Sequence, residues 1–129
     1  MGVRAALSEF GVAVGAGPIE LAAQGVVNLQ MGPGQRLALE EVDDDILLYL
    51  TVDVPHLDPA RCLSLLQACD LHRRPAHEPC VQVGLKGQGA DAQVVLLLRW
   101  PTAGLQASQL LAGLSLLEQC RRDWLGMAG

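Results

Sequence analysis

Residues 92–100 read AQVVLLLRW, a run that is apolar on both of its faces. In an extended strand, successive side chains point to opposite sides, so alternate residues share a face. One face of this run carries Val94, Leu96, Leu98 and Trp100. The other face carries Val95 and Leu97. Because a strand that is apolar on both sides needs a cover on each side, the run predicts an interior strand of a layered fold.

Four more strands are predicted around this one. Residues 80–86 (CVQVGLK) come just before it, and the glycine-containing residues 87–91 join the two as a hairpin. Upstream, apolar and polar residues alternate in three segments: 26–31 (VVNLQM), 36–42 (RLALEEV) and 46–54 (ILLYLTVDV). Turn signals, Gly-Pro-Gly and a triple Asp, separate these segments. The short connections predict an antiparallel meander of three strands.

Three helices complete the pattern. Residues 3–15 carry apolar side chains at helical spacing and are followed by glycine and proline. Asp58, placed as an N-cap before a proline, opens a helix over 59–71, and a long helix over 103–125 closes the chain. The order αβββαββα predicts an α+β fold. We expect one domain over residues 1–129, with a five-stranded antiparallel sheet and three helices.

The composition limits the kinds of partner. Of the 129 residues, 50% are apolar, so the chain can form a hydrophobic core without the help of a metal ion or disulfide bonds. We expect its four cysteines to be free thiols. A net charge of −5 and a single lysine, Lys86, argue against a nucleic-acid partner. No apolar run approaches the roughly 18–20 residues of a membrane span, and the N-terminal residues are expected to belong to the fold. We therefore expect a cytoplasmic protein.

Residues 69–80 (CDLHRRPAHEPC) raise the question of a metal site. They place Cys69, His72, His77 and Cys80 in a C-x2-H-x4-H-x2-C pattern, which is the raw material of a zinc site. Cys69 also continues the apolar stripe of the helix over 59–71, where a free cysteine acts as a small buried hydrophobe. Because the chain has enough apolar residues to form a core without a structural metal ion, we expect residues 69–80 to be a polar loop with no bound metal. A zinc site is the weaker alternative.

The usual patterns of catalytic sites are missing from the sequence. None of the four serines (Ser8, Ser64, Ser108 and Ser115) lies in a G-x-S-x-G turn, and no glycine-rich loop ends in Lys-Ser or Lys-Thr. The triple Asp at 43–45 lacks the spaced oxygens of a calcium loop. We expect neither enzymatic activity nor a cofactor.

Three segments and the order of the elements suggest a family. The segments are 7–15 (LSEFGVAVG), 63–71 (LSLLQACDL) and the pair 83–85 (VGL) with 94–101 (VVLLLRWP). Together with the small, acidic, single-domain chain, they resemble a class I type III secretion chaperone, of the family that includes the chaperone of the translocated intimin receptor. Each motif is degenerate, so the specificity comes from order and size together. One departure is the polar segment 73–79 (RRPAHEP), where the family often has small residues.

The resemblance implies a homodimer without enzymatic activity in the bacterial cytoplasm. Such a chaperone binds the N-terminal segment of a secreted effector in extended form, which keeps the effector soluble and competent for secretion. The secretion ATPase is a further partner on this view. The sequence is compatible with this role, because sheet edges can accept an added strand and apolar grooves can hold client side chains.

The first predicted surface is a client groove. A helix over 3–15 spans only about 18 Å, too short to shield the whole meander, so an open strip is expected beside Glu9, Glu40 and Glu41. The predicted groove residues are Leu7, Phe10, Val14, Val27, Leu29, Met31, Leu37 and Leu39. The alternative for the three helical residues is that they are core packed on the sheet.

The second predicted surface is the dimer interface. Since Val95 and Leu97 make the second face of their strand apolar, we expect a second subunit to cover it rather than the middle helix of the same chain. The predicted interface residues are Cys62, Leu63, Leu66, Cys69, Val83, Val95 and Leu97.

Two other functions remain open at this point. One is a small dimeric scaffold or adaptor that binds folded signalling partners. The other is a small ligand-binding or metal-dependent module centred on residues 69–80. A chaperone should bind an extended peptide, an adaptor should need a folded partner, and a metal module should lose stability with a chelator.

Overall fold

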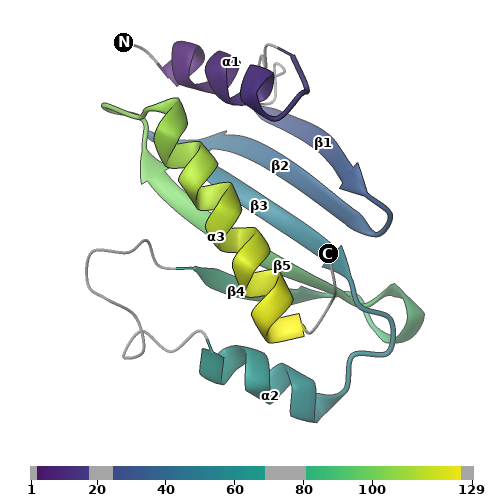
Figure 1. Ribbon diagram of the computed structural model, residues 1–129. Coiled ribbons are helices and arrows are strands. Elements are labelled where there is room, and N and C mark those ends of the chain that lie inside the picture. The colour runs from purple at the N-terminus through teal and green to yellow at the C-terminus, as the bar shows by residue number, and fades with distance from the viewer. Residues whose placement is uncertain (1–2, 18–24, 69–80, 126–129) are drawn as a thin grey trace.

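The strands form one antiparallel sheet in the order β1-β2-β3-β5-β4 (Figure 1). The computed structural model describes residues 3–17, 25–68 and 81–125. Its elements are α1 (Val3–Ala13), β1 (Val26–Gly32), β2 (Gln35–Val42), β3 (Asp45–Asp53), α2 (Pro59–Ala68), β4 (Gln82–Lys86), the 3-10 helix η2 (Gly89–Asp91), β5 (Gln93–Pro101) and α3 (Ala107–Leu125). The predicted α+β class, the five antiparallel strands and the order αβββαββα are confirmed.

The centre of the sheet is the pairing of β3 with β5. Leu48 lies opposite Leu98, and Leu50 lies opposite Leu96, so two strands far apart in sequence share one apolar face. β1 and β2 continue the sheet on one side, and β4 pairs with β5 on the other. β1 and β4 are therefore the edge strands. In β1 the register shifts between Gln30 and Gly32, which is a bulge.

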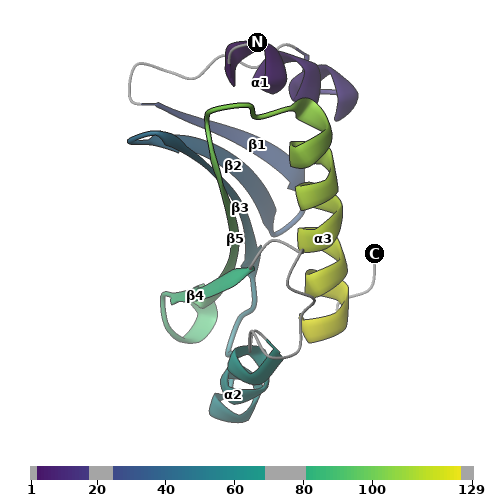
Figure 2. The same ribbon diagram turned by 90° about the vertical axis from the view of Figure 1, so that its left-hand side faces the viewer.

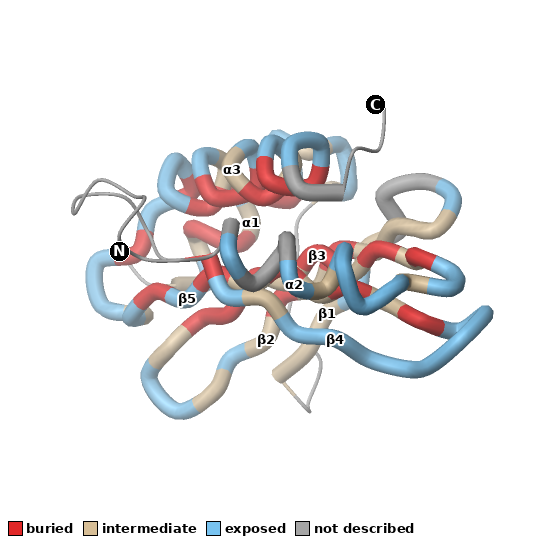
Figure 3. The backbone as a smooth tube through the Cα atoms, turned by 90° about the horizontal axis from the view of Figure 1, so that it is seen from below, coloured by how far each residue is buried: buried red, intermediate tan, exposed pale blue. Residues whose placement is uncertain are grey.

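Two helices cover one face of this sheet (Figure 2). α3 packs on β3 and β5, and α1 lies beside α3 over the β1 end. The buried side chains between these layers form the core, which includes Phe10, Leu37, Leu50, Leu98 and Leu110, all with 1% or less of their surface exposed. α2 lies past the end of the sheet, where it contacts α3. Figure 3 shows the buried residues gathered between α3 and the sheet.

The ends of α1 and α2 follow from local sequence. Gly15 has a φ of +83°, a left-handed conformation that glycine adopts without strain. Its N–H donates to the carbonyl of Val12 (3.1 Å), and the N–H of Ala16 donates to that of Gly11 (2.8 Å), which together form a Schellman cap. The start of α2 is as predicted, because Asp58 Oδ1 accepts the N–H of Arg61 at 2.7 Å.

The last helix begins later than the predicted residue 103. Gly104 has a φ of +73°, and the N–H of Leu105 donates to the carbonyl of Thr102, so these residues form a turn. The Gln109 side chain then accepts the N–H of Gln106 at 2.8 Å, which satisfies one free donor at the helix start. The prediction was wrong here because a left-handed residue interrupts the helix.

α3 lies very close to the sheet at Gly113. A Cβ at this position would lie 2.4 Å from Cη2 of Trp100 and 3.1 Å from a methyl group of Leu98. We expect Gly113→Ala to lower the free energy of unfolding by up to about 2 kcal/mol, because overpacking costs about 1–3 kcal/mol and the better helix propensity of Ala offsets about 1 kcal/mol of that cost. Urea denaturation measures this change. Gly84→Ala is the control, because nothing lies within 4 Å of its Cβ position; equal losses in both variants would contradict the tight contact.

Candidate functional site

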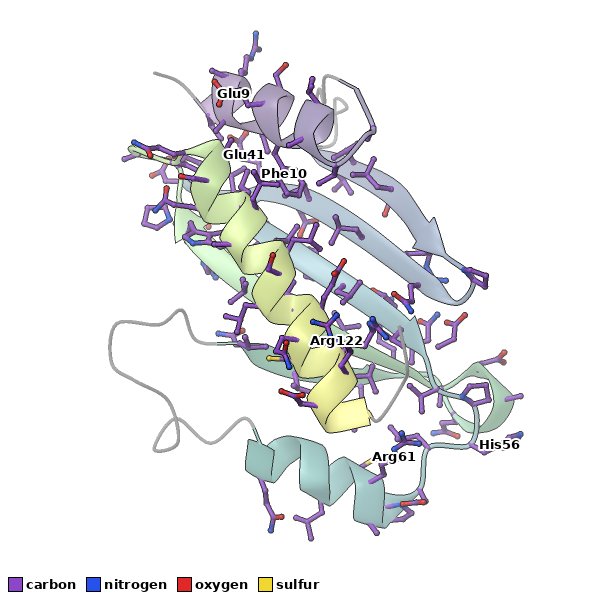
Figure 4. All side chains as sticks on the ribbon, in the orientation of Figure 1. Glu9, Phe10, Glu41, His56, Arg61 and Arg122 are labelled. Carbon is purple, nitrogen blue, oxygen red and sulfur yellow. The ribbon has the colours of Figure 1, made fainter. Side chains whose placement is uncertain are left out.

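Four of the predicted groove residues are core residues. Leu7 is 2% exposed, and Phe10, Leu37 and Leu39 are fully buried. Phe10 points from α1 toward the sheet (Figure 4). The expected open strip is therefore wrong for these four side chains, because α3 lies beside α1 and the two helices together cover what α1 alone would leave open.

The remaining rim lies where α1 meets β1. Val14, Val27 and Leu29 are half-buried and pack against the edge of the core. The Met31 side chain lies outside the described residues. Glu9 and Glu41 are exposed at this end of the molecule, whereas Glu40 lies on the opposite face of the sheet beside Tyr49. What is left of the groove is a narrow apolar rim beside an edge strand.

The predicted dimer residues do not share one face. Val95 and Leu97 are half-buried on the sheet face opposite α3, whereas Val83 packs against the core on the α3 side. On α2, Cys62 is half-buried and Leu63 is 56% exposed. The Leu66 side chain and Cys69 lie outside the described residues.

Leu85 is an exposed apolar residue that the sequence-based prediction missed. It lies on β4, on the same face as Val83 and two residues beyond it, and 47% of its surface is exposed. The alternation of Val83 and Leu85 in a short edge strand is the signal that could have identified it. Leu63 and Leu85 are two of the three large apolar side chains that are exposed among the described residues; Val12, 60% exposed on α1, is the third.

The face of the sheet opposite α3 is hollowed. A hollow of about 310 Å³ is lined by residues from all five strands, among them Asn28, Ala38, Tyr49, Lys86 and Val95. Asn28, Ala38 and Tyr49 lie opposite one another on adjacent strands. Val95 and Lys86 directly follow Val94 and Leu85, which point to the α3 side, so all five residues point away from α3. We call this surface the open face.

Comparison with known proteins identifies the architecture. No protein-family model and no curated protein matches the chain in sequence. A chain of the Yersinia pestis type III secretion chaperone SycH in complex with a stable fragment of YscM2 superposes with a TM-score of 0.70 at 13% identity, covering 92% of this chain and 96% of that chain. The chain has the fold of the type III secretion chaperones.

Two further structures show the same chaperone fold. A chain of the HopA1–SchA chaperone–effector complex superposes with a TM-score of 0.65 at 23% identity, covering 96% of this chain and 93% of that chain. A chain of the ExoT–SpcS complex from Pseudomonas aeruginosa gives a TM-score of 0.62 at 19% identity, covering 93% and 94%. The likeness spans almost the whole chain, as the sequence pattern predicts.

The zinc alternative concerns the C-x2-H-x4-H-x2-C segment. Residues 69–80 are outside the described residues, so the expectation of a metal-free loop stays a prediction. Among residues 3–17, 25–68 and 81–125, no three His, Cys, Asp or Glu side chains come together as a metal site. None of the helices in these ranges has the length and apolarity that crossing a bilayer requires.

On the open face, Tyr49 is held by Glu40. The phenol donates a hydrogen bond to Glu40 Oε1 at 2.7 Å. Burial, this hydrogen bond and the charge of Glu40, in that order, raise the pKa of Tyr49 to about 12, and Arg99 opposes the shift. The folded state thus keeps the phenolic proton more tightly than the unfolded state. The stability that results is complete below pH 10.0 and is lost as the pH rises through about 12.

Tyr49 is the only tyrosine of the chain, so its titration can be followed by ultraviolet absorbance without a competing signal. We expect an ionisation midpoint near pH 12 in the folded protein. Glu40→Gln should lower the pKa of Tyr49, because it removes the carboxylate charge that favours the neutral phenol. Glu41→Gln is the matched control, since Glu41 is exposed and points to the other face of β2. An unchanged midpoint in Glu40→Gln would contradict the pairing.

Proposed function

We propose that the protein is a type III secretion chaperone that binds the N-terminal segment of a secreted effector in extended form. The observation that carries this proposal is the shared fold over more than nine-tenths of the chain with SycH and with the HopA1–SchA complex, both solved with a bound partner. Because one fold can host several functions, the surfaces of this chain must also suit the role. On this proposal the protein works in the bacterial cytoplasm without catalysing a reaction, and the secretion ATPase is a further partner.

Two exposed apolar residues support a homodimer. Leu63 on α2 and Leu85 on β4 are both about half exposed in the single chain, and half-buried Cys62 lies next to Leu63. β4 is also an edge strand, and among the described residues no strand pairs with its outer side. Soluble monomers rarely expose large apolar patches that bind nothing, so we propose that a second copy of the chain covers these residues. The proposed interface is therefore centred on α2 and β4, and Val95 and Leu97, on the neighbouring strand, point to the open face.

The rim beside β1 is the proposed client contact. Val14, Val27 and Leu29 offer a half-buried apolar surface next to an edge strand that can accept one more strand. An extended segment uses its backbone for the strand edge and alternate side chains for the apolar rim. Exposed Glu9 and Glu41 nearby favour a client with basic residues.

The dimer is tested by Leu63→Asp. Because Leu63 is 56% exposed in the single chain, an aspartate there is compatible with folding, whereas it would bury an unpaired carboxylate in the dimer. We expect dimer affinity to fall by at least about tenfold, measured by light scattering over a dilution series. Val12→Asp is the matched control, since Val12 is equally exposed on another helix. A dimer that tolerates Leu63→Asp would place the interface elsewhere.

Client binding is tested with N-terminal segments of about 100 residues from the effectors of the organism that encodes this chain, since a disordered segment of this kind orders on binding. We expect one segment to co-purify with the wild type, and Val14→Glu to weaken its binding by at least about tenfold, because the rim is half-buried. Ser115→Glu on exposed α3 surface is the control. Circular dichroism verifies that both variants are folded.

The same experiment separates the chaperone from the adaptor. A chaperone binds the isolated, unfolded N-terminal segment as well as it binds the whole effector. An adaptor binds only a folded domain. Binding to folded domains alone would count against the proposed function. Unchanged binding of the segment by Val14→Glu would count against the proposed rim.

A further inference from the structure

β1 is an edge strand whose sequence carries no charge. Its residues, Val26–Gly32, read VVNLQMG. Among the described residues, no strand pairs with its outer side. Edge strands are commonly protected by charged side chains or proline, because their free N–H and C=O groups are a template for another chain. In β1 the register shift after Gln30 shortens this template, but residues 26–30 stay regular and uncharged.

The hydrogen bonds between β1 and β2 show which backbone groups of β1 remain free. The N–H of Glu41 donates to the carbonyl of Gly25 at 2.8 Å, and these two residues continue the register of the two strands. In an antiparallel ladder, residues that bond to the neighbouring strand alternate with residues whose backbone groups point away from it. Every second residue from Gly25 on therefore bonds to β2. The residues between them direct their N–H and C=O groups outward: Val26, Asn28 and Gln30.

These outward groups are self-complementary. When a second copy of β1 lies antiparallel with Asn28 opposite its own counterpart, Val26 of each copy faces Gln30 of the other. All three residues then pair through groups that are free in the single chain. On the α3 side of such a ladder, Val27 of each copy faces Leu29 of the other, and both side chains are half-buried at the edge of the core. Apolar pairs directly across a ladder stabilise it.

The acidic residue next to β1 does not oppose this pairing. Glu41 is exposed and bonds to Gly25, which lies three residues, or about 10 Å, from Asn28 along the strand. A two-fold axis at Asn28 therefore places the Glu41 residues of the two copies at opposite ends of the ladder, about 20 Å apart along it. No two like charges of the paired strands face each other, because the strands carry none.

We propose that, without a client, the β1 edge of one copy pairs with the β1 edge of a second copy around a two-fold axis at Asn28. The contact is isologous and about five residues long, since the register shift ends it after Gln30. It is separate from the proposed dimer contact at α2 and β4, because β1 and β4 are opposite edges of the sheet. One edge accepts one neighbouring strand, so a second copy and a client strand exclude each other on β1.

Charge exchange at Asn28 tests the two-fold pairing without any client. Asn28 is exposed, so a charge there is compatible with folding. Asn28→Lys places two ammonium groups opposite each other at the axis, and Asn28→Asp places two carboxylates there. Because like charges directly opposite destabilise a ladder, each variant alone should associate several-fold more weakly than the wild type at low salt. An equimolar mixture of the two variants should recover the lost affinity, because an ammonium group then faces a carboxylate.

Sedimentation velocity over a dilution series measures the growth of the basic unit, a monomer or the α2–β4 dimer, into larger species. Ser115→Lys and Ser115→Asp are the matched controls, because they change the net charge equally at an exposed position of α3. Both controls and their mixture should associate like the wild type. The proposal is overturned if the wild type does not grow beyond its basic unit at about 1 mM, the concentration at which even a weak contact of about −4 kcal/mol is half-formed. It is also overturned if the Asn28 mixture associates no better than its components, or if the Ser115 variants lose as much affinity.

Discussion

The pairing of β3 with β5 is the contact on which the rest of the structure depends. It sets leucine against leucine along the middle of the sheet, and these side chains are fully or almost fully buried under α3. The two strands are separated in sequence by α2 and β4. Because β5 must return beside β3, β4 lies at the edge of the sheet, and α2 contacts α3. The exposed apolar residues Leu63 and Leu85 are a consequence of this connection.

Local signals account for the elements that the sequence predicts. Asp58 caps α2, Gly15 closes α1, and alternation of apolar and polar residues marks most positions of the three strands of the meander. Such signals act within a few residues, so they carry no information on which strand neighbours which. The late start of α3 shows the same limit, because the conformation of Gly104 depends on a turn that helical spacing does not reveal.

The predicted client groove depended on which apolar side chains of the sheet a helix covers, and this part of the prediction was wrong. Alternation shows correctly that Leu37 and Leu39 point to one face. It cannot show whether that face is open, because the cover is completed only when α3, which begins at Ala107, packs beside α1. The double-sided pattern of β5 was more informative: Val95 and Leu97 do lie on a face of their own.

The bulge in β1 has a consequence for how the sheet can grow. The register shift between Gln30 and Gly32, followed by exposed Pro33, ends regular pairing at that edge after Gln30. A chain that adds to β1 therefore finds a short template and cannot continue the ladder around the hairpin. Natural sheets use such interruptions to prevent runaway polymerisation through their edges. If an extended client adds to β1 as proposed, the shift after Gln30 therefore limits the length of the strand that can be added.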